Sequence, residues 1–508
     1  MQKLLNNRIK ILAIILVIIL IATLLPIIYV SKFAYPWADD FGYSADARQA
    51  FLRTGSVFAT LGPAFEHVIN TYFTWQGTYT SCFFMALEPA VFGIKLYHLG
   101  GSIMLLSILL SYYYLLSVVF NKLFNASGAV KWCLLSLLTM YTIQGVDGKA
   151  EAFTWFNSAV HYTFAHSLLI LFIALTVNHI WTSDNKKRIV RTVLISILGF
   201  LAAGTNNITV FGGLLFIVLF YAGLVLYQRV YGDRTYDKFL RSLPMIISFF
   251  VGAAINLGAP GNKQRMLLGS NNNNLFVVVK NSFALGSAFI QRHFSGVTLG
   301  FILLTAAIIW YSNSADKLFE KATFKFPLPV LVTVISFCLL SALYAPFAYL
   351  GDAEISEPYI DANLSVTRVS NTIFFAFVLL LFFNVFYYCG WLHNKGFNKY
   401  SPVAGIALTV AAIIIIACST VQILGQKPGA YTTASAINNI KNGTAAYYGL
   451  QMSENINKLQ SDDAVVYVSP IAVDPDCLYP HEAEDWKSGT KYFFDKEEVI
   501  YDAEPYDF

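Results

Sequence analysis

Charged residues are scarce in this chain of 508 residues. Asp, Glu, Lys and Arg make up only 13% of the sequence, whereas hydrophobic residues make up 56% and aromatic residues 16%. A soluble domain carries roughly 25% charged residues. The composition therefore excludes an ordinary soluble protein and predicts an integral membrane protein.

Paired cysteines and nucleotide-binding motifs are absent from the sequence. The six cysteines are scattered, mostly within apolar runs, and none has the CxxC or Cys/His spacing that zinc requires. Neither a disulfide framework nor a metal–thiolate site is supported. No GxxxxGK[ST] loop or GxGxxG turn follows a strand, so nothing is arranged to cradle a nucleotide phosphate. We also expect no nucleic-acid partner.

Long apolar runs are abundant. At about 1.5 Å rise per residue, roughly 20 apolar residues cross a hydrocarbon core of about 30 Å. The first run is too long for the core of a signal peptide, so we interpret it as a retained span. Together the runs predict about eleven spans. They lie near 11–30, 99–120, 161–181, 208–227, 328–347, 371–390 and 402–424, with shorter or interrupted ones near 132–145, 189–203, 242–257 and 296–311.

Short connections that collect Lys and Arg indicate the orientation of the spans. The connections near 3–10, 122–131, 186–191, 229–241, 317–325 and 395–399 collect Lys and Arg, which mark cytoplasmic loops. Placing them in the cytoplasm puts the N-terminus inside and the loops 31–78, 146–160, 258–280 and 348–370 on the outer face. This path requires that residues 82–97, interrupted by Glu88 and Pro89, do not cross the membrane.

The residues from Gly425 onward differ from the rest. They contain 6 Lys and Arg against 14 Asp and Glu, whereas the preceding residues contain 28 against 16. They alternate polar and apolar residues and include AVVYVSP (464–470), which is typical of a strand. We therefore predict an all-α polytopic transmembrane domain (1–424), with catalytic loops on the outer face, followed by a small acidic α/β extracytoplasmic domain (425–508).

Two adjacent carboxylates, Asp39 and Asp40, follow the first span in SKFAYPWADDFGYS (31–44). A positioned carboxylate can remove the proton of an attacking hydroxyl. Its neighbour could orient it or help to hold a divalent cation, the one cofactor that we consider. Alternatively, the pair only marks the membrane surface. Glu151, in the second outer loop, is a further acidic candidate.

Basic and aromatic residues of the outer loops supply the complementary candidates. A guanidinium can stabilise a departing lipid phosphate by bidentate hydrogen bonds, unless it extends to lipid headgroups instead. Aromatic rings can stack on sugars, unless they belong to the interfacial belt. The phosphate-binding candidates are Arg265, Lys263, Arg292 and Arg368, and the substrate-binding candidates are Tyr43, Trp75, Trp155, His161, Tyr162 and Asn262.

Five short motifs occur in order along the chain: DDFGY (39–43), WQG (75–77), EAFTWFNSAVHY (151–162), APGNKQR (259–265) and AAYYG (445–449). Their layout resembles the GT-C superfamily of multi-spanning glycosyltransferases, and more narrowly a group of bacterial polytopic membrane proteins of unassigned function. The pattern departs from that family at Thr78, where a basic residue is expected, and at Asn206 or Asn207, where an acidic one is expected.

The resemblance implies a bacterial enzyme of cell-envelope polysaccharide biosynthesis. Asp39 or Asp40 would be the catalytic base, with Glu151 as a second acidic residue. The enzyme would move a sugar from a polyprenyl-phosphate donor, embedded among the membrane lipids, to a glycan or lipid-linked acceptor outside the cell membrane. The alternatives are a transporter or flippase for lipids or glycan precursors, and a non-catalytic assembly subunit. Transporters tend to show inverted repeats and broken helices, which this sequence does not show.

Overall fold

The computed structural model describes residues 2–182, 187–231, 236–267, 274–320, 322, 324–349, 367–397, 402–478 and 487–501. The longer helices are α1 (Gln2–Ser31), α5 (Gly100–Leu116), α6 (Gly128–Gln144), α8 (Ala165–Ile180), α9 (Arg188–Ala203), α10 (Asn207–Tyr231), α11 (Tyr236–Leu257), α13 (Leu275–His293), α14 (Gly296–Asp316), α15 (Pro329–Ala342), α18 (Thr367–Asn394) and α19 (Pro402–Gln426). The shorter elements are α2 (Asp39–Thr54), η1 (Phe58–Thr60), α3 (Leu61–Thr74), α4 (Tyr79–Ala86), η2 (Pro89–Val91), η3 (Ile94–Leu99), η4 (Ser117–Leu123), η5 (Ala150–Thr154), α7 (Phe156–Ala159), η6 (Val160–Phe164), α12 (Pro260–Leu267), α16 (Ala345–Tyr349), α20 (Thr432–Lys441), α21 (Thr444–Leu459), β1 (Val465–Val468), α22 (Lys487–Phe493) and β2 (Glu498–Tyr501).

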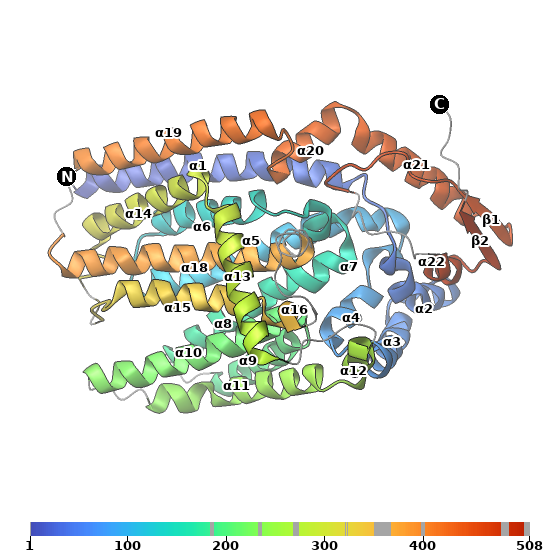
Figure 1. Ribbon diagram of the computed structural model, residues 1–508, viewed down its shortest axis with the longest axis horizontal. Helices are drawn as coiled ribbons and strands as arrows, with labels where there is room; N and C mark the ends of the chain where they lie inside the picture. The colour runs from blue at the N-terminus through green and yellow to red at the C-terminus, as the bar shows by residue number, and fades with distance from the viewer. Residues whose placement is uncertain are drawn as a thin grey trace.

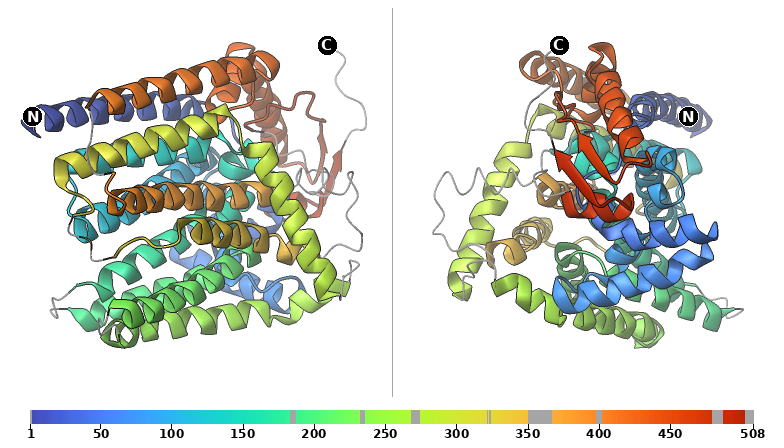
Figure 2. Two further views of the ribbon diagram at one scale, coloured as in Figure 1. Left: turned by 60° about the vertical axis from the view of Figure 1, so that its left-hand side comes forward. Right: turned by 90° about the vertical axis from the view of Figure 1, so that its right-hand side faces the viewer.

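Most of the longer helices run side by side as a bundle, and short elements gather at one end of it (Figure 1). We call this end, which carries α2, α3, α4, α12 and α20–α22, the capped end. The N-terminus lies at the opposite end, where α10, α14 and α18 end and α11, α15 and α19 begin (Figure 1 and Figure 2). Three of the basic connections of the sequence join these helices. These three basic connections therefore belong to the end opposite to the capped end.

Eight helical stretches in the described part of the chain are long and apolar enough to cross a membrane. They are Asn7–Ser31, Ile94–Leu123, Phe156–Ile180, Asn207–Arg229, Lys238–Leu257, Gly296–Asp316, Thr367–Asn394 and Gly405–Gln426. The chain is thus an all-α polytopic membrane protein. The three other expected spans form α6, α9 and α15, of 17, 16 and 14 residues. At about 1.5 Å per residue these helices are shorter than the hydrocarbon core, so the count of eleven stays a prediction.

The first helix has one face toward the protein and one away from it. Ala13, Leu16 and Leu20 are buried, whereas Ile14 and Ile18 are 61% and 60% exposed. In water such a row of exposed isoleucines would be unfavourable, but lipid is as apolar as they are. The exposed face of α1 is therefore suited to face lipid.

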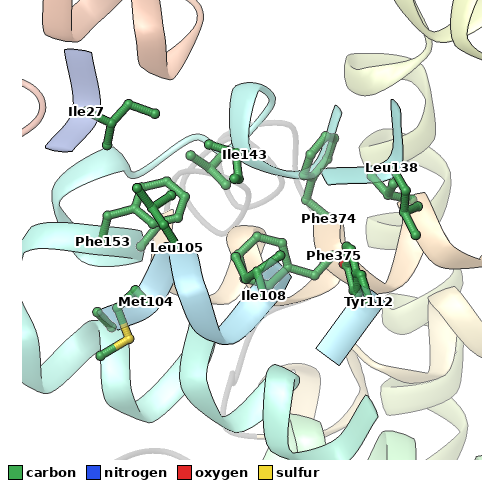
Figure 3. Close-up of a cluster of buried hydrophobic side chains, with 14 of the residues drawn as sticks. Ile27, Met104, Leu105, Ile108, Tyr112, Leu138, Ile143, Phe153, Phe374 and Phe375 are labelled. Carbon is green, nitrogen blue, oxygen red and sulfur yellow. The ribbon is translucent and has the colours of Figure 1, made fainter. Parts of the chain in front are cut away.

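The centre of the bundle is filled by large apolar side chains from four helices and from η5 (Figure 3). On α5 the buried residues recur at the spacing of one helical face. In lipid such a core stabilises the fold through close van der Waals packing between helices. Its labelled members are Ile27 of α1, Met104, Leu105, Ile108 and Tyr112 of α5, Leu138 and Ile143 of α6, Phe153 of η5, and Phe374 and Phe375 of α18.

The C-terminal residues fold against the capped end. The predicted strand in AVVYVSP is confirmed as β1, which pairs in parallel with β2 from Val465 opposite Glu498 to Val468 opposite Tyr501. Nε2 of Gln49 in α2 donates hydrogen bonds of 3.1 Å to the carbonyl oxygens of Tyr492 and Phe493 in α22. The described part of the tail is therefore packed onto the bundle. Its placement outside the cell stays a prediction.

Residues 82–93 do not form a long helix. They comprise the second half of α4 and the short turn η2, which begins at Pro89, whereas residues 94–97 lie in η3 at the start of the candidate span Ile94–Leu123. At about 1.5 Å per residue the eight residues of α4 span roughly 12 Å, too little to cross a membrane. The structure thus agrees with the interpretation that this stretch does not cross.

Candidate functional site

The two adjacent carboxylates occupy the first turn of α2, but their surroundings are opposite. Asp40 is completely buried, whereas Asp39 is exposed. Successive residues of a helix point about 100° apart, so one of the pair can face the protein interior while the other faces outward. The chain enters the helix through Ala38, whose φ of 49° is unusual for a residue other than glycine.

Asp40 joins three segments of the chain. Its Oδ2 accepts hydrogen bonds from the backbone N–H of Trp37 at 2.9 Å and from the hydroxyl of Tyr97 at 2.5 Å. Its Oδ1 accepts from the backbone N–H of Asn157 at 3.0 Å. Burial raises the pKa of Asp40 to about 7, although these hydrogen bonds lower it. Because solvent does not reach this carboxyl, its position suits the alignment of its neighbours better than proton transfer to a substrate.

Glu88 forms a second buried carboxyl beside Asp40. Ser44 Oγ lies 2.6 Å from the carbonyl oxygen of Asp40 and 3.0 Å from Oε1 of Glu88. The hydroxyl of Ser44 donates to the carbonyl oxygen of Asp40 and to Oε1 of Glu88. Burial also raises the pKa of Glu88 well above its usual range. Glu88 is therefore a buried carboxyl that accepts from a serine and is harder to ionise than an exposed glutamate.

Asp39, unlike Asp40, lies near two arginines. Solvent reaches its carboxylate, yet enough protein surrounds it that burial raises its pKa, while the charges of Arg368 and Arg265 lower it. The same two arginines act electrostatically on the ring of His161. Four residues that were selected from the sequence thus gather at the capped end, although they come from four separate segments of the chain.

Arg265 is held by the WQG motif. Its Nη1 donates a hydrogen bond of 2.9 Å to Oε1 of Gln76, and its guanidinium lies 4.9 Å from the ring centroid of Trp75. Nε2 of Gln76 donates in turn to the hydroxyl of Tyr43 at 3.0 Å. A planar guanidinium between an amide and an aromatic ring is restricted in orientation. Gln76 therefore connects the motif of Arg265 to the helix that carries Asp39.

The WQG turn also contacts the APGN turn through the backbone. Oδ1 of Asn262 accepts from the N–H of Gly77 at 3.1 Å. A Cβ at Gly77 would lie 1.9 Å from the carbonyl oxygen of Asn256, and one at Gly261 would lie 2.4 Å from the backbone nitrogen of Trp75. Both positions require glycine because the two backbones touch there.

Asn206, which departs from the family pattern, has a structural role. Its Oδ1 accepts from the N–H of Thr209 at 2.9 Å in the first turn of α10, and its Nδ2 donates to the carbonyl oxygen of His161 at 2.5 Å. Thr78 is buried, and its Oγ1 lies 3.6 Å from Sγ of Cys82. Both residues are buried.

Glu151 and Arg292 lie in a neighbouring polar cluster. Glu151 is buried and accepts a hydrogen bond of 3.0 Å from the hydroxyl of Thr367. Arg292 and His293 flank Asp147, at 3.3 Å and 3.5 Å from its two carboxylate oxygens. Burial raises the pKa of Asp147, but the hydrogen bond and charge of His293 outweigh this and hold it below its usual value. Thr367 is followed directly by Arg368, which connects this cluster to Asp39.

The remaining sequence candidates are distributed around these groups. Trp155 is buried, and its indole N–H donates to the carbonyl oxygen of Trp37 at 3.3 Å. The ring of Tyr162 lies 4.9 Å from that of His161, and Lys263 is exposed.

Among the described residues, no three His, Cys, Asp or Glu side chains are placed together as ligands of a metal ion. Asp40, whose oxygens face three donors, is poorly placed to help Asp39 hold a divalent cation.

Two residues of the candidate site, Gln76 and Asn157, were not among the candidates selected from the sequence. Gln76 lies inside the WQG motif, and Asn157 lies inside EAFTWFNSAVHY, so the motifs contained them without distinguishing them. Both polar atoms of the Asn157 side chain are buried and have no partner within the described residues. Such a group needs water or a ligand, because buried polar atoms are almost always hydrogen-bonded.

No protein-family model matches the chain, and no curated protein sequence matches it.

Proposed function

We propose that the protein is a membrane glycosyltransferase of the GT-C type, which moves a sugar from a polyprenyl phosphate to a glycan or lipid-linked acceptor on the outer face of the cell membrane. The observation that carries the proposal is the position of Asp39, an exposed carboxylate within the electrostatic reach of two arginines at the capped end of a polytopic bundle. The motif order of the sequence supports the same class of enzyme.

The reaction assigns complementary roles to these charges. The acceptor hydroxyl attacks the anomeric carbon and its proton passes to the carboxylate of Asp39, while the bond to the lipid phosphate breaks and the phosphate leaves with the electron pair. A raised pKa makes Asp39 a better base than an ordinary aspartate, because general bases work best near the operating pH. Arg265 and Arg368 stabilise the negative charge that develops on the phosphate.

The supporting residues hold this arrangement in place. Asp40 fixes the first turn of α2 through its hydrogen bonds to Trp37, Tyr97 and Asn157. Gln76 and Trp75 orient the guanidinium of Arg265. We call these positioning residues, because the reacting atoms would contact Asp39 and the arginines and not them. Asn157, with its unpartnered amide, is suited to contact a sugar hydroxyl.

The proposal assigns the capped end to the outer face, because basic connections at the opposite end are typical of cytoplasmic loops. A donor linked to a lipid reaches such a site from the bilayer. The apolar outer face of the bundle and the short elements at its end are compatible with a substrate that is half lipid and half sugar.

Reconstitution tests the proposal. The purified chain in liposomes should transfer label to an acceptor fraction of cell-envelope glycan and lipid from a panel of polyprenyl-phosphate sugars radiolabelled in the sugar. The lipid phosphate should be released in equal amount. The contrary result is movement of intact labelled lipid between leaflets without acceptor and without cleavage, which would identify a flippase instead.

A further inference from the structure

A polar cleft lies in the C-terminal tail, outside the site described above. It has a volume of about 350 Å³, within the range of small-ligand pockets, and is bounded by α20, the start of α21 and residues 472–476. The lining residues that carry the argument are Ser435, Asn438, Asn439, Asn442, Asp474 and Asp476. Positions 435, 438, 439 and 442 follow the i, i+3, i+4, i+7 spacing of one helical face. The α20 helix and the residue that ends it, Asn442, thus present one hydroxyl and three amides to the cleft.

The chemistry of this lining matches a sugar. Amides and hydroxyls offer both donors and acceptors, and carboxylates add acceptors, which together suit the alternating demands of sugar hydroxyls. Lys and Arg are absent from the lining, so the cleft does not suit a phosphate. Its volume also exceeds the needs of a bare cation.

Part of this polar lining is not satisfied by the protein. Oδ1 of Asn439 is buried and lacks a hydrogen-bond partner in the described part of the chain. The carboxylate of Asp476 accepts from Ser435 Oγ at 3.4 Å and lies 3.7 Å from Nζ of Lys149. Gly429 allows Asp476 to lie close to the chain, because a Cβ there would be 3.2 Å from its Oδ2. The cleft therefore combines a carboxylate held by Ser435 and Lys149 with an amide oxygen whose hydrogen bond the described residues do not supply.

The cleft is coupled to the loop that carries Glu151. Lys149 precedes Glu151 by two positions and pairs with Asp476, and the hydroxyl of Thr154 donates to the carbonyl oxygen of Cys477. The helix α20 begins at Thr432, shortly after the membrane-spanning α19 ends at Gln426. Figure 1 shows α20 and α21 at the capped end of the bundle. A ligand in the cleft would therefore stand at the same end of the bundle as Asp39.

We propose that this cleft binds a neutral, hydroxyl-rich sugar unit of the acceptor glycan and so holds the acceptor beside the transfer site. The role of this sugar as acceptor rests on the proposed function, whereas the binding of a sugar in the cleft does not. The tail would then supply acceptor recognition, and the outer loops of the bundle would supply the chemistry.

Saturation-transfer NMR on the full chain in detergent tests this inference. The probes are neutral monosaccharides and disaccharides at millimolar concentration, and the variants are Asn438→Ala and Asn439→Ala. Asn457→Ala is the matched control, since Asn457 is exposed on α21 away from the cleft lining. We expect at least one sugar to bind to the wild type and to Asn457→Ala, and to bind roughly 2- to 10-fold more weakly to each cleft variant.

The inference is overturned if no sugar in the panel binds, if binding is equal in the cleft and control variants, or if Ca²⁺ binds there and sugars do not. Thermal unfolding of each variant separates loss of binding from loss of fold. Asp39→Asn should leave sugar binding intact. Binding in the cleft without any transfer by the wild type would refute the proposed function alone, and transfer without binding would refute the cleft alone.

Discussion

Oδ1 of Asp40 accepts the backbone N–H of Asn157 at 3.0 Å, across 117 positions of sequence. The contact joins the start of α2 to the second loop of the capped end. Through Tyr97, whose hydroxyl also accepts from the N–H of Phe156 at 2.9 Å, the same carboxylate reaches η3. The geometry around Asp39 therefore depends on its buried neighbour.

Removal of the Asp40 carboxylate should destabilise the protein. Asp40→Ala would leave the donors of Trp37, Tyr97 and Asn157 buried without an acceptor, and each such group costs about 1–3 kcal/mol. We expect a loss of several kcal/mol, measured as a lower thermal unfolding midpoint in detergent. Asp46→Ala, which changes an exposed residue of α2, is the control. Equal midpoints for the two variants would show that the network around Asp40 is not structural.

Stability should also depend on pH through the buried carboxyls. The pKa of Asp40 is raised by burial from 3.8 to about 7, and that of Glu88 is raised as well. The folded protein therefore keeps protons that the unfolded chain releases, so the free energy of unfolding should fall as the pH rises from about 4 to about 7. The double variant Asp40→Asn, Glu88→Gln should show a flatter profile in the same unfolding measurements. An unchanged pH dependence in this variant would assign the effect to other groups.

The two backbone contacts between motifs should not tolerate a methyl group. Gly77→Ala and Gly261→Ala would place a Cβ within 2.4 Å of backbone atoms. Because backbone cannot move aside as a side chain can, we expect a loss of about 1–3 kcal/mol or more, seen as a lower unfolding midpoint and a lower yield of folded protein. Gly62→Ala, with no atom within 4 Å of the new Cβ, should behave as the wild type. Wild-type stability of Gly77→Ala would contradict the contact.

Sugar transfer should be slowed even by the replacement of Arg265 with lysine. Arg265→Lys keeps the charge but loses the planar group that bonds to Gln76 and stacks on Trp75. If this guanidinium stabilises the leaving phosphate, transfer should slow by roughly 10²–10³-fold. The control Arg53→Lys alters an exposed arginine whose Nε donates to the carbonyl oxygen of Gln49 in its own helix. Turnover of the two variants with the same donor, together with their melting curves, checks this role.

The sequence predicts the helices of the bundle well, because a helix that crosses lipid must be a long apolar run. The apolar runs become helices, and the strand in AVVYVSP is present as β1. The number of true spans is harder to predict, because α6, α9 and α15 combine apolar composition with short length. Whether such helices cross depends on their neighbours and on the bilayer, which local composition does not encode.

The sequence identified the motifs that form the candidate site, but it did not predict the role of each residue in it. Asp39 and Asp40 are equivalent in the sequence, and only the partners of Asp40 at positions 97 and 157 distinguish them. Gln76 and Asn157 were missed because a lone amide has no motif of its own. Arg292 was a further phosphate-binding candidate behind Arg265, but it pairs with Asp147, a contact between segments 145 positions apart. Such long-range pairings are set by how the helices pack.

Sugar transfer should depend on the carboxylate of Asp39, the proposed base. Asp39→Asn keeps the size of the side chain but removes its basicity, so transfer from the polyprenyl-phosphate sugar should fall by roughly 10²–10⁴-fold while the unfolding midpoint is unchanged. Asp46→Asn on the same helix should retain full turnover. Turnover by a well-folded Asp39→Asn protein at the rate of Asp46→Asn would contradict the account.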